Sequence, residues 1–421
     1  MPAQEGRGSA KVIPLIPARD LAATGQRQLH FRNPPPLALY VHVPWCVQKC
    51  PYCDFNSHAL PQTRDGGRPA SAIPEDDYLA ALTADLEAAL PTIWGRRVDS
   101  IFLGGGTPSL LSGEAVDRLL TALRSRLPLL PNAEISLEAN PASVEAGKFA
   151  AFRAAGVNRL SIGIQSFNPR HLKALGRAHD DREARQAIEI AARHFDNFNL
   201  DLIYGLPGQA PGEALADLDA ALAFAPPHLS CYQLTIEANT AFAAQPPTLP
   251  EADSCADMQD AIEARLAAAG YTHYETSAFA RSGQQCRHNL NYWHFGDYLG
   301  IGAGAHSKLT LHDRVLRQMR WKRPEQYLAK AAAGTPIQQE FAIAAVDLPF
   351  EFMLNALRLL QGFDSPLFES RTSLPLLTVE NELRQAERDG LIERRQQRIA
   401  PSDRGRRFLN QLLERFLVDR R

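Results

Sequence analysis

Residues 40–53, YVHVPWCVQKCPYC, place Cys46, Cys50 and Cys53 at spacings of four and three residues. Six cysteines in 421 residues are too few for a disulfide scaffold, and clustered cysteines in a reducing compartment more often bind metal. A short loop with these spacings can hold three corners of an iron–sulfur cube and leave the fourth iron without a protein ligand. Ligand chemistry at a metal needs such an open position. The stretch therefore predicts a [4Fe–4S] cluster on these three cysteines.

A zinc site completed by His42 or His58 is the alternative, as are cysteines that only pack. Zinc sites usually pair their cysteines as two C-x-x-C hooks, and this sequence does not contain them. The sequence therefore favours the cluster.

Composition describes an ordinary globular chain, with 45% hydrophobic and 22% charged residues. The length favours two or three domains, or one barrel with an appendage. A net charge of −2 argues against a large basic face, so no nucleic-acid partner is expected. The sequence begins without the pattern of a secretory signal and contains no run of about 18 apolar residues, so we expect a cytoplasmic protein.

From Leu37 onward, short β-rich runs alternate with stretches of helical period, which is the pattern of a parallel sheet. The expected strands are Leu37–Val43, Val98–Leu103, Glu134–Glu138, Arg159–Gln165, Phe198–Ile203 and Leu229–Ile236. The expected helices lie near 76–90, 114–126, 143–155, 181–194, 212–224 and 252–269. Six such units predict an α/β fold, an incomplete (βα)6 barrel whose site lies at the carboxyl ends of the strands.

Changes in character along the chain suggest four parts. Residues 1–35 resemble a flexible extension, 36–280 the partial barrel, 281–340 a linker region rich in Gly, aromatic residues and His, and 341–421 a mostly helical domain. The last part resembles a winged-helix unit, in which a helix, a turn at Gly390 and a short hairpin precede a final helix. Its charge is only mildly positive, which favours a packing or partner role over DNA binding.

Glycines and polar residues follow the expected strands. Gly104-Gly105-Gly106-Thr107 comes directly after the second strand, where glycines allow a backbone to approach a ligand. Glu138 ends the third strand and could accept hydrogen bonds from hydroxyls or an amine, although it could equally be a solvated loop acid. Asp201 lies in an otherwise apolar strand, where a carboxylate is costly without partners.

The C-x-x-x-C-x-x-C motif after the first strand resembles the signature of the radical S-adenosylmethionine (SAM) superfamily. The resemblance implies that SAM chelates the open iron through its amine and carboxylate. It also implies that an electron donor reduces the cluster, which cleaves SAM to a 5′-deoxyadenosyl radical.

Over about residues 37–416 the motif blocks resemble those of the oxygen-independent coproporphyrinogen III oxidase family. The SAM contacts that this resemblance implies are Tyr40, the Tyr52 backbone, Gly105, Gly106, Thr107, Glu138, Gln165, Arg177 and Asp201.

Two features bear on the branch of that family. Decarboxylases of the family carry a further cysteine two residues after the third, where this chain has Phe55. The run from His288 to Trp293, H-N-L-N-Y-W, resembles the H-N-x-x-Y-W motif of the HemW-like haem chaperones, which bind haem and pass it to acceptors such as cytochromes, membrane-associated acceptors among them. The resemblance implies a haem chaperone. Radical decarboxylation of coproporphyrinogen III is the alternative, so the sequence leaves open whether the chain is an enzyme.

Haem needs an apolar slot, an axial donor and partners for its propionates. The candidate haem-binding residues are His288, Asn289, Tyr292 and Trp293, with Phe295 and Tyr298 as further walls and His294 and His306 as further donors. Alternatively, His288 and Asn289 only satisfy buried backbone groups. The nearby Gly300-Ile-Gly302-Ala-Gly304 follows no clear strand and precedes no clear helix, so it does not support a dinucleotide site.

Overall fold

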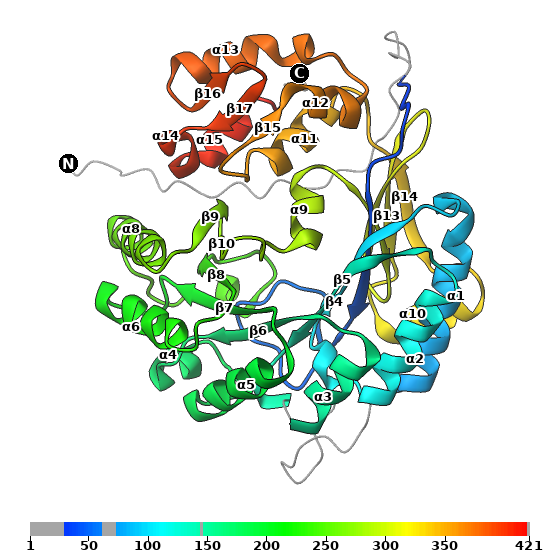
Figure 1. Cartoon of the computed structure of the whole chain (residues 1–421), viewed down its shortest axis with the longest axis vertical. Coiled ribbons are helices and arrows are strands. Elements are labelled where there is room, and N and C mark those ends of the chain that lie inside the picture. The colour runs from blue at the N-terminus through cyan, green and yellow to red at the C-terminus, as the bar shows by residue number, and fades with distance from the viewer. Residues whose placement is uncertain (1–28, 61–72, 144–145, 419–421) are drawn as a thin grey trace, which may run out of the picture.

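The computed structural model describes residues 29–60, 73–143 and 146–418, and its centre is a twelve-stranded sheet (Figure 1). The strand order is β14-β13-β12-β11-β1-β4-β5-β6-β7-β8-β10-β9, so β14 and β9 are the two edges and the sheet stays open. The central parallel strands are β1 (Leu37–Val43), β4 (Val98–Gly105), β5 (Leu129–Ala139), β6 (Arg159–Gln165), β7 (Phe198–Tyr204) and β8 (His228–Gln233). The expected incomplete barrel is confirmed.

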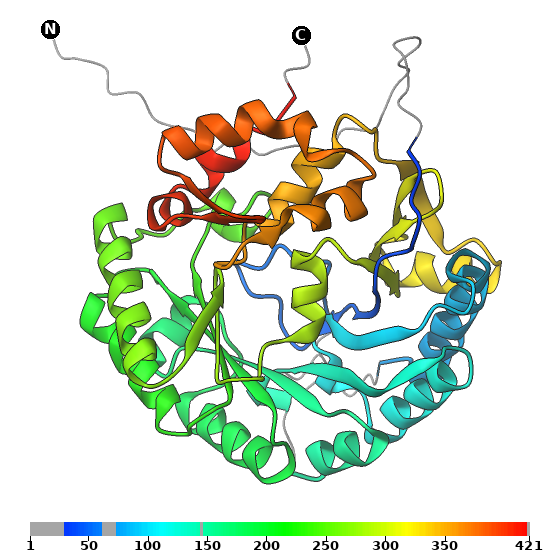
Figure 2. The ribbon, with the colours of Figure 1, turned by 45° about the horizontal axis from the view of Figure 1, so that its top comes forward.

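Helices cover the outer, convex face of the curved sheet (Figure 2). They include α1 (Glu75–Ile93), α2 (Gly113–Arg124), α3 (Ala146–Ala155), α5 (Asp181–His194), α6 (Pro211–Leu222) and α8 (Ala252–Ala268). Local sequence explains the ends of these helices: Ser112 caps α2, and Asp180 and Glu183 form a capping box on α5. All six expected strands and helices are present, although β5 begins at Leu129 rather than Glu134.

The two faces of the parallel strands differ in chemistry. Leu137, Leu160 and Leu200 belong to the large apolar core. Alternate positions on the same strands are polar and point the other way, into the barrel, because side chains alternate along a strand. These polar positions include Glu134, Ser136, Glu138, Arg159, Ser161, Asn199, Asp201, His228 and Ser230. Strands buried on both faces usually read as continuous apolar runs, so this polar lining indicates a site inside the barrel.

The sheet continues beyond residue 280. Strand β11 (Asp297–Ile301) pairs in parallel with β1, and β12 (His306–Thr310), β13 (Val315–Arg320) and β14 (Ile337–Ala342) extend it antiparallel. The region expected to link the barrel to the last domain thus supplies four strands. The short helix α9 (Arg287–Trp293) lies between the barrel and the C-terminal domain.

The glycines of the G-x-G-x-G run serve close packing. A Cβ on Gly302 would lie 2.4 Å from the carbonyl oxygen of His42, and one on Gly304 would lie 2.2 Å from Asn56 Nδ2. Asn56 Nδ2 donates hydrogen bonds to the carbonyl oxygens of Ala303 and Lys322, both at 2.9 Å. Strand β11 contains Gly300, and strand β12 rather than a helix follows the run. The glycines therefore let this part of the sheet pack closely against β1 and against Asn56, which follows the three cysteines.

The C-terminal domain has its own apolar cluster. Its elements are α11 (Leu348–Ala356), α12 (Ser365–Thr372), α13 (Glu380–Arg388), the hairpin β16 (Ile392–Arg395) and β17 (Arg398–Pro401), α14 (Asp403–Arg407) and α15 (Leu409–Glu414). This order of helix, hairpin and helix is the expected winged-helix-like arrangement. Leu29 and Phe31 are buried in the same cluster, so the segment expected to be flexible is packed from residue 29, and its residues 1–28 lie outside the described residues.

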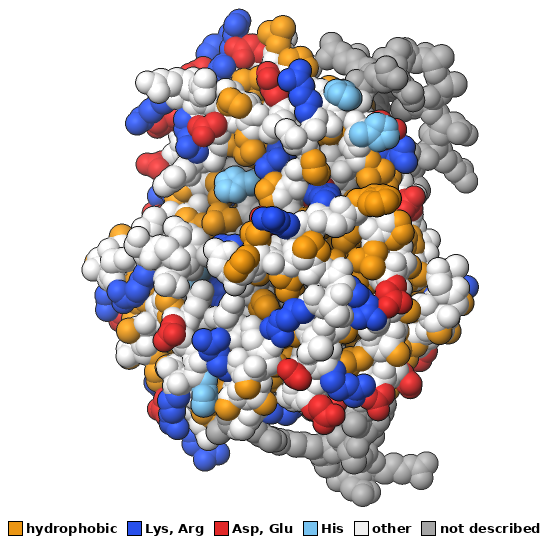
Figure 3. Space-filling model, turned by 45° about the vertical axis from the view of Figure 1, so that its right-hand side comes forward, with side chains coloured by type: hydrophobic (Ala, Val, Ile, Leu, Met, Phe, Trp, Pro, Cys, Tyr) orange, Lys and Arg blue, Asp and Glu red, His pale blue; other side chains and the backbone are white. Residues whose placement is uncertain are grey.

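Charges of both signs are scattered among hydrophobic side chains on the face shown in Figure 3. Within the described residues, no helix is long and apolar enough to cross a membrane.

Candidate functional site

The cysteine loop begins directly after β1. Cys46 lies in β2 (Trp45–Cys46), which pairs in parallel with β3 (His58–Ala59) and so closes the loop on itself. The amide of Cys53 donates to the carbonyl oxygen of Cys50 at 3.2 Å. All three cysteines are free thiols and half-buried.

Each of the three sulfurs has a polar neighbour. Thr107 Oγ1 donates to Cys46 Sγ at 3.4 Å, Arg177 donates to Cys50 Sγ at 3.7 Å, and Cys53 Sγ lies 3.8 Å from Ser57 Oγ. Burial raises the pKa of Cys46, and the Cys53 and Cys50 thiols raise that pKa further. Three thiols with donors directed at the sulfurs fit a thiolate-held iron–sulfur cluster.

A single-ion site is the arrangement that the zinc alternative requires. Among the described residues, no three His, Cys, Asp or Glu side chains, the three cysteines included, are grouped closely enough to hold a metal ion, so this geometry does not separate the zinc alternative from the cluster.

The glycines after β4 let this strand end lie directly on the cysteine loop. The Gly106 amide donates to the carbonyl oxygen of Val43 at 2.7 Å, and the Thr107 amide donates to that of Trp45 at 2.7 Å. A Cβ on Gly106 would lie 2.5 Å from the Trp45 oxygen, and Gly105 has φ +114° beside the ring of His42. These amides are therefore engaged within the protein, and close packing is the role of the glycines that the structure shows.

Two half-buried carboxylates, Glu138 and Asp201, lie on strands of the barrel interior. Glu138 accepts a hydrogen bond from the Gly105 amide at 3.0 Å, and Asp201 accepts from Ser161 Oγ at 3.1 Å and Asn199 Nδ2 at 2.8 Å. Burial raises the pKa of Glu138 to about 7, and the charge of Asp201 contributes to the rise. A pair of half-buried acids favours a cationic ligand. SAM, with its sulfonium and ammonium groups, fits this interior.

Arg177 connects the barrel to the cysteine loop. Arg177, beyond α4 (Pro169–Ala174), donates both to Cys50 Sγ and to the Gly163 carbonyl oxygen, the latter at 2.7 Å. Gln165 ends β6 with φ +68°, a strained conformation for a non-glycine residue. Tyr52 packs on an apolar cluster that contains Leu175, next to the same turn. Arg177 thus reaches the cysteine loop, whereas Gln165 lies with the Arg177 guanidinium near Gly163.

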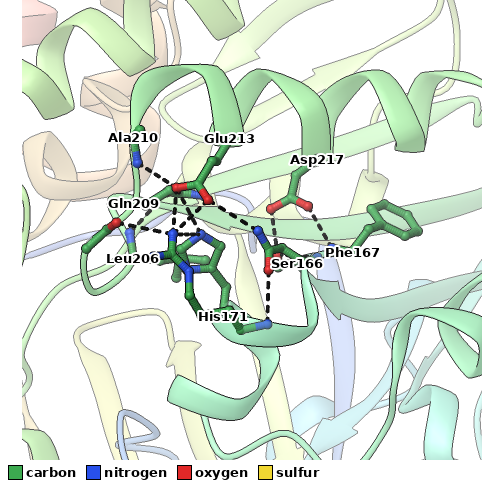
Figure 4. A network of polar contacts seen from close by, with 11 residues as sticks. Ser166, Phe167, His171, Leu206, Gln209, Ala210, Glu213 and Asp217 are labelled. Atoms are coloured by element: carbon green, nitrogen blue, oxygen red, sulfur yellow. Dashed lines mark hydrogen bonds and ion pairs between the residues drawn. The ribbon is translucent and has the colours of Figure 1, made fainter.

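A polar network that was not predicted supports α4 (Figure 4). Asp217 on α6 accepts from Ser166 Oγ at 2.6 Å and from the Phe167 amide at 2.7 Å, and Glu213 lies 3.4 Å from His171 Nε2. These contacts fix α4, the helix that precedes Arg177, and so help to place Arg177 beside Cys50. The helix-start residues Asn168-Pro169 were a usable signal for α4, whereas its acidic partners lie about 50 residues further along the chain.

Tyr40 lies in a stack of rings inside the barrel. Its hydroxyl is 3.1 Å from His42 Nδ1, and its ring stacks on Phe102 at 6.3 Å between centroids. Phe102 in turn stacks on His288 at 5.0 Å. Tyr40 therefore connects the cysteine-loop side of the barrel with α9.

Helix α9 presents two faces. Glu134 accepts from the amides of Arg287 and His288, both at 3.0 Å, and so fixes the start of the helix. His288 and Tyr292, four residues apart, point into the barrel, and Asn289 and Trp293 lie on another face. His288 is 1% exposed, and burial lowers its pKa to about 3.

The remaining haem candidates separate in space. Phe295 is 1% exposed within the C-terminal cluster, whereas Tyr298 is half-buried against Tyr292 and Arg317. His294 and His306 are both exposed, the first at the end of α9 and the second at the start of β12.

Comparisons with known proteins agree with this site. The chain matches the models of the radical SAM superfamily over residues 40–221 and of the HemN C-terminal domain over 343–408. It is 47% identical over 387 residues to the protein named haem chaperone HemW in Escherichia coli K12, covering 91% of this chain and 99% of that protein. Its identity to HemW of Mycobacterium tuberculosis H37Rv is 38% over 389 residues, covering 91% and 95%.

A solved structure of coproporphyrinogen III oxidase (HemN) from Escherichia coli, described as a radical SAM enzyme, matches with a TM-score of 0.75 at 26% identity, covering 91% of this chain and 90% of that one. The cysteine loop, the fold and the sequence similarity over nearly the whole chain agree. The chain therefore belongs to the HemW family of radical SAM proteins.

Proposed function

We propose that this protein is a haem chaperone that binds haem and delivers it to acceptor haem proteins. The observation that carries the proposal is the 47% identity, over 91% of the chain, to a relative that is named a haem chaperone. The motif of α9 supports it, because this helix lies between the barrel and the C-terminal domain.

The cofactor set of the proposal follows from the site. Cys46, Cys50 and Cys53 hold a [4Fe–4S] cluster, and the interior with Glu138 and Asp201 takes SAM; together these groups supply one-electron chemistry when bound. Arg177 and Thr107 donate to two of the sulfurs and so orient the loop. An electron donor belongs to the proposal, and so does a cytoplasmic location, because the thiols must stay reduced.

The haem-contacting part of the proposal is the outer face of α9. Trp293 and Asn289 contact the ligand, and His288 and Tyr292 hold the helix in the barrel. Cytochromes, including membrane-associated ones, are the proposed class of acceptor.

Radical decarboxylation of coproporphyrinogen III is the second candidate, and the similarity to HemN favours it. Against it stands Phe55, 61% exposed, at the position where decarboxylases of the family carry a further cysteine.

One paired experiment separates the two functions. Anaerobically prepared protein with its cluster receives haemin in one tube, and coproporphyrinogen III, SAM and reductant in another. The chaperone predicts a Soret band that shifts on haemin binding and no release of CO2. Release of CO2 with formation of protoporphyrinogen would overturn the proposal.

A further inference from the structure

Three buried polar atoms without a hydrogen-bond partner in the described structure belong to side chains that meet at one junction. They are Trp293 Nε1 on α9, Arg358 Nε just after α11, and Glu275 Oε2 at the end of β9 (Thr272–Glu275). The Arg358 guanidinium lies 4.5 Å from the centre of the Trp293 ring, and one of its terminal nitrogens lies 3.7 Å from Glu275 Oε2. Helix α9, the barrel sheet and the C-terminal domain therefore each contribute one of these side chains.

The backbone around Arg358 is fixed. The Thr276 amide donates to the Arg358 carbonyl oxygen at 3.1 Å, and the Leu360 amide donates to that of Tyr274 at 3.2 Å. An isolated bridge pairs Glu275 with Leu359. The Cα of Arg358 is therefore held on both sides, and the contacts with the Trp293 ring and Glu275 position its guanidinium.

Glu275 lies beside one terminal nitrogen of the Arg358 guanidinium, whereas Arg358 Nε has no hydrogen-bond partner in the described structure. The residue is 3% exposed, and its Oε1 accepts from the Ser277 amide at 3.2 Å. The Arg358 side chain as a whole is 31% exposed, whereas its Nε is buried, so a ligand reaches this nitrogen only when the side chain shifts. Two N–H groups, one on the indole and one on the guanidinium, are left without an acceptor.

Buried donors without an acceptor are costly, and each such group in a native structure calls for a partner. A carboxylate can accept from both N–H groups, with one of the two bonds charge-assisted. The chemistry of the junction therefore matches an anionic, planar acceptor.

We propose that Trp293 Nε1 and Arg358 Nε bind a carboxylate, and that this carboxylate is a haem propionate. This assignment rests on the proposed function. It adds Arg358, a residue of the C-terminal domain, to the proposed haem contacts. Glu275 is a positioning residue that orients Arg358.

The test compares haemin with haemin dimethyl ester, which has the same ring but no free carboxylates. Both are titrated anaerobically into the cluster-containing protein and followed by the Soret band. The wild type should bind haemin about tenfold or more tightly than the ester, as a charge-assisted hydrogen bond implies. Trp293→Phe and Arg358→Gln should each lose most of this preference while binding the ester as the wild type does.

The matched control is Arg395→Gln, because the Arg395 side chain is 82% exposed and pairs only locally with Glu393. It should keep the wild-type preference. Trp293→Phe keeps an aromatic ring but removes the five-membered ring together with its N–H group, so binding of the ester reports the lost ring contact separately from the lost hydrogen bond. The test therefore does not depend on Arg358→Gln folding normally.

An unchanged preference in both variants would overturn the assignment, and so would an equal weakening of haemin and ester. Failure of the wild type to bind haemin at all would overturn the proposed function itself, which keeps the two failures distinguishable.

Discussion

His288 Nε2 lies 3.0 Å from the hydroxyl of Tyr292, one helical turn later, and the other ring nitrogen lies 3.0 Å from Ser100 Oγ. Both nitrogens of this imidazole are therefore engaged inside the barrel, at 1% exposure. A histidine in this state supports the helix on which it lies. Its use as an axial haem ligand would require both bonds to break.

Replacing His288 with Ala should destabilise the fold and preserve the spectrum of bound haemin. The change removes a buried ring and leaves two hydroxyls without partners, so the free energy of unfolding should fall by about 3 kcal/mol. Denaturant unfolding measures the loss, and the Soret band reports the iron ligand. Tyr292→Phe is the control and should cost about 1 kcal/mol. A lost Soret shift at unchanged stability would identify His288 as a ligand instead.

Replacing Cys50 with Ala should abolish the cluster. A cube held by two thiolates has lost a corner as well as the donor contact from Arg177. Iron content and the broad visible absorbance of anaerobic protein measure the effect. Cys255→Ala, on α8 and buried, is the matched control and should retain iron. Equal iron in both variants would contradict the assigned ligands.

Gly106→Ala should lower cluster occupancy severalfold. The added Cβ would lie 2.5 Å from the carbonyl oxygen of Trp45, so the cysteine loop or the end of β4 must move. Gly212→Ala on α6 is the control, since a Cβ at Gly212 meets nothing within 4 Å. Iron per chain after identical reconstitution is the readout. Full occupancy in Gly106→Ala would show that the loop tolerates the displacement.

Glu138 should make stability fall as the pH rises. Its folded pKa of about 7 lies above the ordinary value of 4.5, so the folded state binds more protons between these values. The free energy of unfolding should therefore drop across that window, by about 3 kcal/mol from this group. Glu138→Gln should flatten the drop and be more stable than the wild type at pH 8 but not at pH 4. The same variant should bind SAM about tenfold or more weakly, because it removes a half-buried charge.

Urea unfolding of the cluster-containing protein at pH 4, 6 and 8 checks the first expectation, and SAM titration checks the second. Parallel pH profiles of wild type and variant would refute the raised pKa.

Local signals were enough to predict the first half of the barrel. Strands β1 and β6 run as expected from Leu37 to Val43 and from Arg159 to Gln165, because each is a β-rich run bounded by turns. The spacing of the three cysteines within one short loop also predicted the family, whereas their role as cluster ligands stays a prediction. The start of β5 was missed because its Leu129-Leu-Pro-Asn opening resembles a turn.

Features that depend on distant partners could not be predicted. The four strands after α9 are short, and their glycines are explained only by contact with His42 and Asn56. The direction of the His288 ring depends on Ser100, 188 positions earlier. Arg358 carries no motif, and its role follows only from the junction at which α9 and the two domains meet.

Transfer of haem to an acceptor tests the central claim most directly. Protein loaded with haemin is mixed with the apo form of a b-type cytochrome, and the cytochrome's Soret band is followed over a range of acceptor concentrations. The account predicts a transfer rate that rises with acceptor concentration, because delivery passes through a complex of the two proteins. A rate that is independent of the acceptor, and equal to spontaneous haem dissociation, would contradict it.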